Sequence, residues 1–115
     1  MTGKTKRYDC APGCPVEAAL DVIGGKWKAV ILYHLGKGGL RFGALQRRLN
    51  GITARMLTRQ LRELEADGLV VRTVHAVVPP RVDYALSADG ATLQPVIDTL
   101  YAWGKLRQEK AAQAA

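Results

Sequence analysis

The sequence predicts a mainly α-helical domain that carries a small β-hairpin. Three observations lead to this fold class. Residues 53–67 have apolar side chains at helical spacing, a second helical pattern ends only a few residues earlier at Asn50-Gly51, and after Gly68 the pattern changes from helical to extended. Two helices joined by a short turn that contains glycine are typical of a helix-turn-helix, and a β-hairpin directly behind them makes the arrangement a winged helix.

The helix expected over residues 53–67 has two opposed faces. Its apolar stripe consists of Ala54, Leu57, Leu61 and Leu64. At about 100° per residue, Arg55, Arg59 and Arg62 point about 140° to 200° away from this stripe. Thr53 suits the N-cap, Gly68 suits the C-terminal stop, and the acidic residues lie in the last turns. We therefore expect the N-terminal half of this helix to face a polyanion and the C-terminal half to face water.

The segments before this helix predict three shorter ones. Apolar spacing places them over residues 15–23, 26–35 and 42–49, with a very short strand at Leu40-Arg41. Pro15 fits the first position of the first helix, and glycines follow all three. The expected stripes are Val16, Ala19, Leu20 and Ile23, then Trp27, Val30, Ile31, His34 and Leu35, then Phe42, Leu45 and Leu49. His34 lies on the apolar stripe of the second helix, where we expect it to be a partly buried histidine rather than a residue that ligates a metal.

The segments after Gly68 predict the hairpin and a last helix. Strands are expected over residues 69–74 and 82–86, joined by a loop that two prolines stiffen. Ser87 suits the N-cap of the final helix, inside which Pro95 should kink or divide the run. The apolar side chains of this helix exceed what so small a core can bury.

Length and charge restrict the classes of protein. A chain of 115 residues suits one compact domain, which we expect over residues 14–108, after a flexible basic arm (1–13) and before a frayed tail (109–115). The arm is either disordered or in contact with phosphates. No apolar run approaches the roughly 18 residues of a membrane span, and no signal-peptide pattern is present, so we expect a cytoplasmic protein with no membrane partner.

Excess positive charge points to nucleic acid. Seventeen Lys and Arg against ten Asp and Glu give a net charge of +7, and residues 41–62 contain six arginines and no acidic residue. Arginine suits forked contacts to phosphate and guanine, although a merely solvated basic face is the alternative. The candidate DNA-binding residues are Arg41, Thr53, Arg55, Met56, Thr58, Arg59 and Arg62 on the helix-turn-helix, with Arg72 and Arg81 on the wing.

Apolar residues on the first and last helices predict a second copy of the chain as partner. The candidate dimer residues are Val16, Leu20, Leu100, Tyr101 and Trp103. A ligand pocket walled by the aromatic pair is the alternative that we rank second. A two-fold dimer would read an inverted-repeat operator.

Several motifs occur in an order that resembles the HxlR family of bacterial transcriptional regulators. They are residues 14–28 (CPVEAALDVIGGKWK), Arg41-Phe42, residues 52–70 (ITARMLTRQLRELEADGLV) and residues 78–87 (VPPRVDYALS). The resemblance covers about residues 14–104. It implies a winged helix related to the MarR type, a homodimer formed by the first and last helices, operator DNA as partner, and repression or activation. It also implies an electrophile, an oxidant or another small-molecule effector, because several members sense such compounds through a cysteine placed like Cys14.

Cys14 has a physical case of its own. It precedes Pro15 at a helix start, where the positive end of the helix lowers the pKa of a thiol. The alternative is a small residue that packs or caps there. Cys10 is an addition to the family pattern, and a bridge to Cys14 would need the turn between them to bring the two sulfurs together. We expect no cofactor and no metal, since His34 and His75 lack the spacing of zinc ligands.

Two rival classes remain. An enzyme is not expected, because the sequence has no nucleophile-base arrangement, no phosphate-binding glycine pattern and no plausible carboxylate pair. The second rival is a non-enzymatic adaptor whose basic face binds an acidic protein or RNA. Preference for a defined duplex over random duplex at moderate salt separates the adaptor from the regulator.

Overall fold

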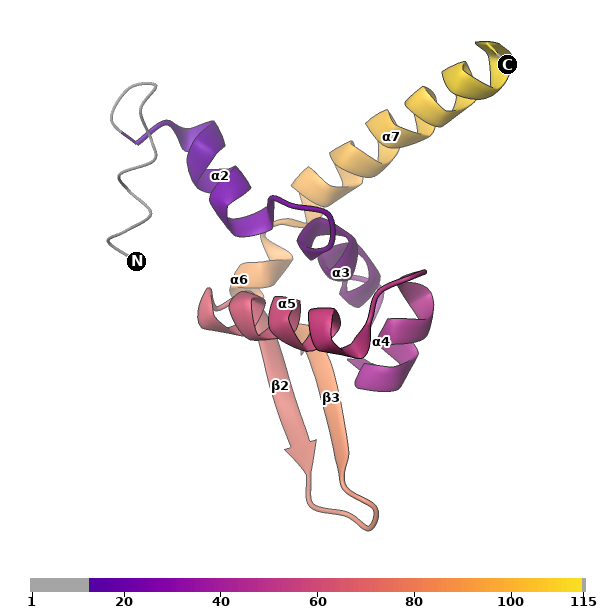
Figure 1. Ribbon diagram of the computed structural model, residues 1–115. Helices are drawn as coiled ribbons and strands as arrows, with labels where there is room; N and C mark the ends of the chain where they lie inside the picture. Colours follow the sequence, from indigo (N-terminus) through magenta and orange to yellow (C-terminus); the bar gives the residue numbers. More distant parts are fainter. Residues whose placement is uncertain (1–12, 115) are drawn as a thin grey trace.

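The computed structural model describes residues 13–114 and shows helices around a small antiparallel sheet (Figure 1). The helices are α2 (Pro15–Ile23), α3 (Lys28–Leu35), α4 (Phe42–Arg48), α5 (Ala54–Ala66), α6 (Ala88–Ala91) and α7 (Gln94–Ala114), and the strands are β1 (Leu40–Arg41), β2 (Val70–His75) and β3 (Arg81–Leu86). This order confirms the mainly helical class with a hairpin wing. The expected basic arm and Cys10 lie outside the described residues, apart from Gly13.

The core is formed where α3, α4 and α5 meet. Its largest fully buried side chains are Ile31, Leu32, Leu45, Leu49, Leu57, Leu61 and Leu64. Two stripe assignments were wrong: Leu32 is buried where Val30 was expected, and Ala54 is exposed at the start of α5. In α2 only Ile23 is buried, and Val22 packs against the core in a partly buried position.

The turn between α4 and α5 is tight and well satisfied. Gly51 has a φ of 92°, a left-handed conformation that favours glycine. The Gln46 side chain donates a hydrogen bond to the Ile52 carbonyl at 3.3 Å. Thr53 Oγ1 accepts from the Met56 backbone N–H at 3.1 Å, which confirms Thr53 as the N-cap of α5. The orientation of α5 is therefore fixed at its first turn.

The wing is a three-stranded antiparallel sheet in the order β1-β3-β2. In its register, Val70 lies opposite Leu86 and His75 lies opposite Arg81, so five residues form the loop at the tip. The short strand β1 pairs with β3, with Leu40 opposite Tyr84 and Arg41 opposite Asp83. The hairpin is thereby joined to the segment that leads directly into α4.

Pro95 divides the last helical run. Ser87 caps the short α6, where its Oγ accepts from the Gly90 N–H at 2.9 Å, and α7 then begins at Gln94. Pro95 occupies the first turn of α7, where a missing N–H leaves no helical bond unmade. Helix α7 continues to Ala114, so residues 109–114 are helical rather than frayed. None of the helices in residues 13–114 combines the length and apolarity of a membrane span.

His34 is half-buried on α3, as expected, with its ring edge-on to Tyr33. Burial lowers the pKa of His34 below its ordinary 6.5, and the charges of Arg48 and Lys37 lower it further. The fold therefore prefers the neutral imidazole. As the pH falls through 6.5 the unfolded chain takes up the proton first, so the free energy of unfolding decreases.

We expect this loss of stability to be smaller in a His34→Gln protein. Denaturant unfolding at about pH 7.5 and about pH 5.5 measures it as the difference between the two proteins, which removes the contribution of all other groups. An equal loss in both proteins would show that His34 does not carry the effect.

Candidate nucleic-acid interface

The outer face of α5 carries three exposed arginines. Arg55, Arg59 and Arg62 all point to solvent, whereas Leu57, Leu61 and Leu64 on the opposite face are buried. Since the cap and the leucines hold the helix, these guanidinium groups are presented from a rigid element. The amphipathic reading of this helix is confirmed, with Ala54 as the exception.

The other predicted DNA-binding residues in and next to α5 are less available for contact. Met56 is half-buried and packs against the core, where its sulfur accepts from the Gln60 amide at 3.5 Å. Thr58 is also half-buried, while Thr53 is exposed and its hydroxyl oxygen is engaged in the cap. The exposed arginines are therefore better placed for contact than Met56 or Thr58.

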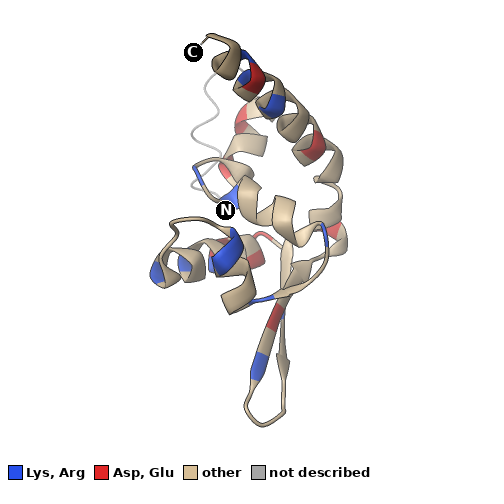
Figure 2. Ribbon diagram, turned by 90° about the vertical axis from the view of Figure 1, so that its right-hand side faces the viewer, with Lys and Arg blue, Asp and Glu red and all other residues tan. Residues whose placement is uncertain are grey.

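Further basic residues extend this surface. Arg41 on β1 and Arg47 and Arg48 on α4 are exposed. Figure 2 shows Lys and Arg on the helices next to the wing and on the wing itself, whereas acidic and basic residues are mixed along α7. Positive charge is thus concentrated at the end of the molecule that holds the helix-turn-helix and the wing.

One acid of α5 does not simply face water, contrary to expectation. Glu63 Oε1 lies 2.7 Å from Lys28 Nζ, and Glu63 Oε2 lies 3.4 Å from Arg59 Nε. The hydrogen bond from Lys28 is the main reason that the pKa of Glu63 is lowered, and Arg59 lowers it further. The spacing of Arg59 and Glu63 indicates a pair on one helix, but no local pattern connects either of them to Lys28 on α3.

The two wing arginines lie on opposite faces of the sheet. Side chains alternate along a strand and directly opposed residues share a face. Arg72 lies opposite Tyr84, whereas Arg81 is two residues from Asp83, which lies opposite Arg41. The structure therefore brings Arg41 and Arg81 to one face and places Arg72 on the other.

Arg81 is held beside an acid. Its Nε lies 3.6 Å from Asp83 Oδ2, and the same oxygen lies 2.9 Å from His75 Nε2. The Arg81 side chain is 40% exposed, so the end of its guanidinium group reaches solvent. Asp83 and His75 were not among the predicted DNA-binding residues, because their proximity to Arg81 depends on the strand register.

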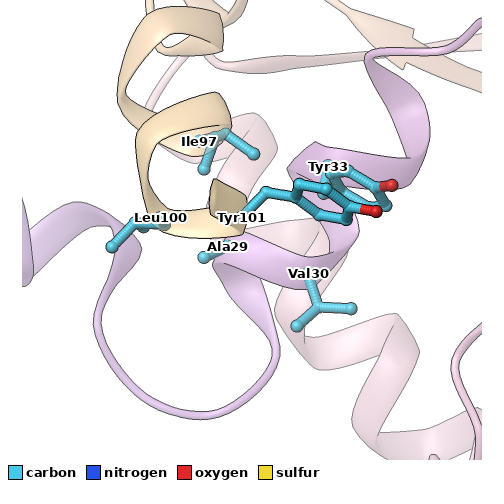
Figure 3. A pocket seen from close by; sticks show the side chains of 6 residues that line it. All are labelled: Ala29, Val30, Tyr33, Ile97, Leu100 and Tyr101. Carbon is cyan, nitrogen blue, oxygen red and sulfur yellow. The ribbon is translucent and has the colours of Figure 1, made fainter. Parts of the chain in front are cut away.

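Helices α2 and α7 lie at the end of the molecule away from the wing (Figure 1), and both expose apolar side chains. We call this set the α2/α7 apolar surface, and it consists of Val16, Leu20, Val96, Leu100, Tyr101, Trp103 and Leu106. A hollow of about 230 Å³ adjoins this set between α3 and α7, and it is lined by Ala29, Val30, Tyr33, Ile97, Leu100 and Tyr101 (Figure 3). The rings of Tyr33 and Tyr101 stack there, 5.4 Å apart and 7° from parallel. All five predicted dimer residues are exposed on this surface.

Cys14 is the N-cap residue of α2 and is half-buried. Its carbonyl accepts from the Ala18 N–H at 3.0 Å, so the cysteine is joined to the first turn. Its side chain makes no cap hydrogen bond, which argues against the purely capping alternative. The thiol thus lies at the positive end of the helix that bears Val16 and Leu20.

Comparison with known proteins gives one consistent family. Residues 22–112 match the model of the HxlR-like helix-turn-helix family. The HTH-type transcriptional regulator YybR of Bacillus subtilis is 49% identical, over 95% of this chain and 87% of the relative. The redox regulator HypR is similar in both solved forms: the oxidised form has 53% identity, a TM-score of 0.78, and coverage of 80% of this chain and 95% of HypR. The reduced form has 48% identity and a TM-score of 0.81, and the match covers 87% of this chain and 99% of HypR.

The relatives are named as regulators of transcription, which is a non-enzymatic role, and the fold agrees with that of the solved structures. The chain therefore belongs to the HxlR-like helix-turn-helix family and is a transcriptional regulator with a winged helix-turn-helix domain.

Proposed function

We propose that this regulator binds double-stranded operator DNA in a sequence-specific manner as a homodimer and responds to thiol-reactive compounds through Cys14. The observation that carries the proposal is the α5 face, where three exposed arginines stand opposite a buried leucine stripe. A recognition helix of this type places its N-terminal residues against base edges in the major groove. Arg55 and Arg59 are then the base-reading candidates, while Arg62 meets a phosphate.

The α2/α7 apolar surface supports a dimer. Its side chains include Trp103 at 63% exposed and Val16 at 65% exposed, values that are unfavourable for large apolar groups left in water. A second copy would cover them and set two reading helices about a two-fold axis. Half-sites of an inverted repeat would then lie about 34 to 36 Å apart, or multiples of that.

Cys14 supports thiol sensing through its position. A thiolate at the start of α2 is stabilised by the helix dipole, and an adduct there would lie beside Val16 of the proposed interface. The similarity to HypR, a redox regulator solved in oxidised and reduced forms, favours the same type of response.

Footprinting on the DNA that flanks its own gene, with and without a thiol oxidant, tests the proposal. We expect a protected inverted repeat, and equal competition by random duplex at moderate salt would contradict sequence-specific binding. Preferential binding to RNA or to an acidic protein would favour the adaptor alternative instead.

A Cys14→Ser protein is expected to give the same footprint whether or not the oxidant is present. The reason is that serine cannot form a thiolate or a disulfide at the start of α2. The matched variant is Cys10→Ser, which should keep the response if Cys14 acts alone. An oxidant response that survives in Cys14→Ser would refute the role of this thiol.

A further inference from the structure

Lys28, Glu63 and Arg59 form a chain of contacts from the core to the reading face of α5. Lys28 is the first residue of α3, and its side chain is only 12% exposed. Its ammonium group lies 2.7 Å from Glu63 Oε1, while the other carboxylate oxygen of Glu63 lies 3.4 Å from Arg59 Nε. The Arg59 side chain is 72% exposed. A nearly buried cation is thus connected through one carboxylate to an open guanidinium group.

Two effects hold the Glu63 carboxylate in place. A largely buried ammonium group needs an opposite charge, because leaving it unpaired is costly. Lys28 also lies in the first turn of α3, where the positive end of the helix disfavours a cation and favours an anion. The Glu63 carboxylate pairs with the ammonium group and also supplies the anion at the start of α3. The hydrogen bond from Lys28 keeps Glu63 ionised by lowering its pKa. The carboxylate is therefore anchored from its inner side.

The position of that carboxylate decides which part of Arg59 is available. Guanidinium has five N–H donors in a planar fork, and Glu63 takes the one at Nε. The terminal edge between Nη1 and Nη2 is left free, and it presents two parallel N–H donors. A forked contact to guanine O6 and N7 needs two such donors in a fixed plane.

We propose that Glu63, anchored by Lys28, is a positioning residue for Arg59 that orients the terminal edge of its guanidinium group toward one base pair. This inference rests on the proposed role of α5 in reading DNA. The alternative is an ordinary exposed pair on one helix, which stabilises the helix slightly and has no effect on base discrimination.

Glu63→Gln separates the two possibilities. Sites are first selected by the wild-type protein from a random duplex pool, and discrimination is the Kd ratio between each single-base-pair variant and the selected site. Glutamine keeps one oxygen for Lys28 but presents a donor to Arg59. We expect discrimination to fall about 5- to 10-fold at the base pair that Arg59→Ala identifies. Binding to random duplex should become about 2- to 3-fold tighter, because a negative charge near the phosphates is removed.

Two further variants distinguish orientation from charge. Glu65→Gln removes the same charge from the same helix, and Glu65 makes no ion pair with any residue in the range 13–114, so it should tighten binding to random duplex and keep discrimination. Lys28→Met removes a positive charge, so it should weaken binding to random duplex. Because it also removes the anchor of Glu63, it should reduce discrimination at the same base pair. Circular dichroism and thermal unfolding check that each variant is folded. Opposite charge changes with the same loss of discrimination would identify orientation as the cause.

The outcomes separate this inference from the proposed function. If the wild-type protein has no preferred site, the proposed function is wrong. If Arg59→Ala loses discrimination and Glu63→Gln keeps it, the positioning role is wrong and DNA reading by Arg59 stands. If Arg59→Ala itself keeps discrimination, Arg59 is not the reader and the positioning role fails with it. In the Arg59→Ala background, Glu63→Gln should cause no further loss.

Discussion

A Trp103→Glu protein is expected to be a monomer and to bind the operator about 100- to 10,000-fold more weakly than the wild-type protein. Trp103 is 63% exposed on α7, so its replacement leaves the core of the domain intact. A glutamate there would place a charge in the proposed dimer interface, and the cost of removing it from water exceeds the gain from pairing with Arg107, which lies one turn along α7. Without the dimer, the second half-site no longer benefits from the high effective concentration that links the two reading helices. Light scattering and operator titration measure the two effects together.

Ala102→Glu is the matched control. Ala102 is exposed on the same helix, and at about 100° per residue it lies about 100° from Trp103 and about 160° from Leu100, with Leu106 one turn further on. It adds the same charge at the edge of the α2/α7 apolar surface, so we expect a dimer that is weakened much less than in Trp103→Glu. A Trp103→Glu protein that stays dimeric at working concentration would contradict the proposed interface.

Replacing Arg59 by alanine is expected to cost about 1 to 3 kcal/mol of operator binding, concentrated on one or two base pairs. The reason is that a forked contact to base edges is lost while the phosphate contacts remain. Affinity for a set of operators that differ at single positions shows whether the loss is local. An equal loss on all sequences would instead make Arg59 a phosphate contact.

Arg81→Ala is the comparison for this result. A wing contact to the backbone should weaken binding to all sequences and make the salt dependence shallower by about one ion per site. Arg72 lies on the other face of the sheet from Arg81 and Arg41. If the face that carries Arg41 and Arg81 meets the DNA, Arg72→Ala should change the salt slope less than Arg81→Ala. Identical behaviour of Arg59→Ala and Arg81→Ala would contradict the separate roles of helix and wing.

The local chemistry of this chain could be predicted well from its sequence. Thr53 caps α5, Gly51 takes the left-handed turn, and Pro95 divides the last helical run, because each effect depends on neighbours within a few residues. The order of elements followed from changes in apolar period. The end of α7 was placed too early, since an alanine-rich sequence gives no clear stop signal.

Features that depend on distant residues could not be predicted. The pairing of Lys28 with Glu63 joins two helices, and no spacing rule connects them. The faces of Arg72 and Arg81 depend on the strand register, which the loop at the tip leaves undetermined, and a shift of one residue would exchange them. Val30 and Leu32 differ in burial because the packing of α7 and α4 around α3 selects the buried face, not apolarity alone.

The short strand β1 has a consequence for how such a domain can be controlled. Because Leu40 and Arg41 pair with β3 and lead without a gap into α4, the wing and the helix-turn-helix are tied together at their base. A signal that bent one against the other would have to break the pairing of β1 with β3, and the backbone groups released in this way would need new partners. The wing and the helix-turn-helix of one subunit therefore form one rigid unit. In the proposed dimer, an effector can more readily change the distance and angle between the two units than the shape of either unit.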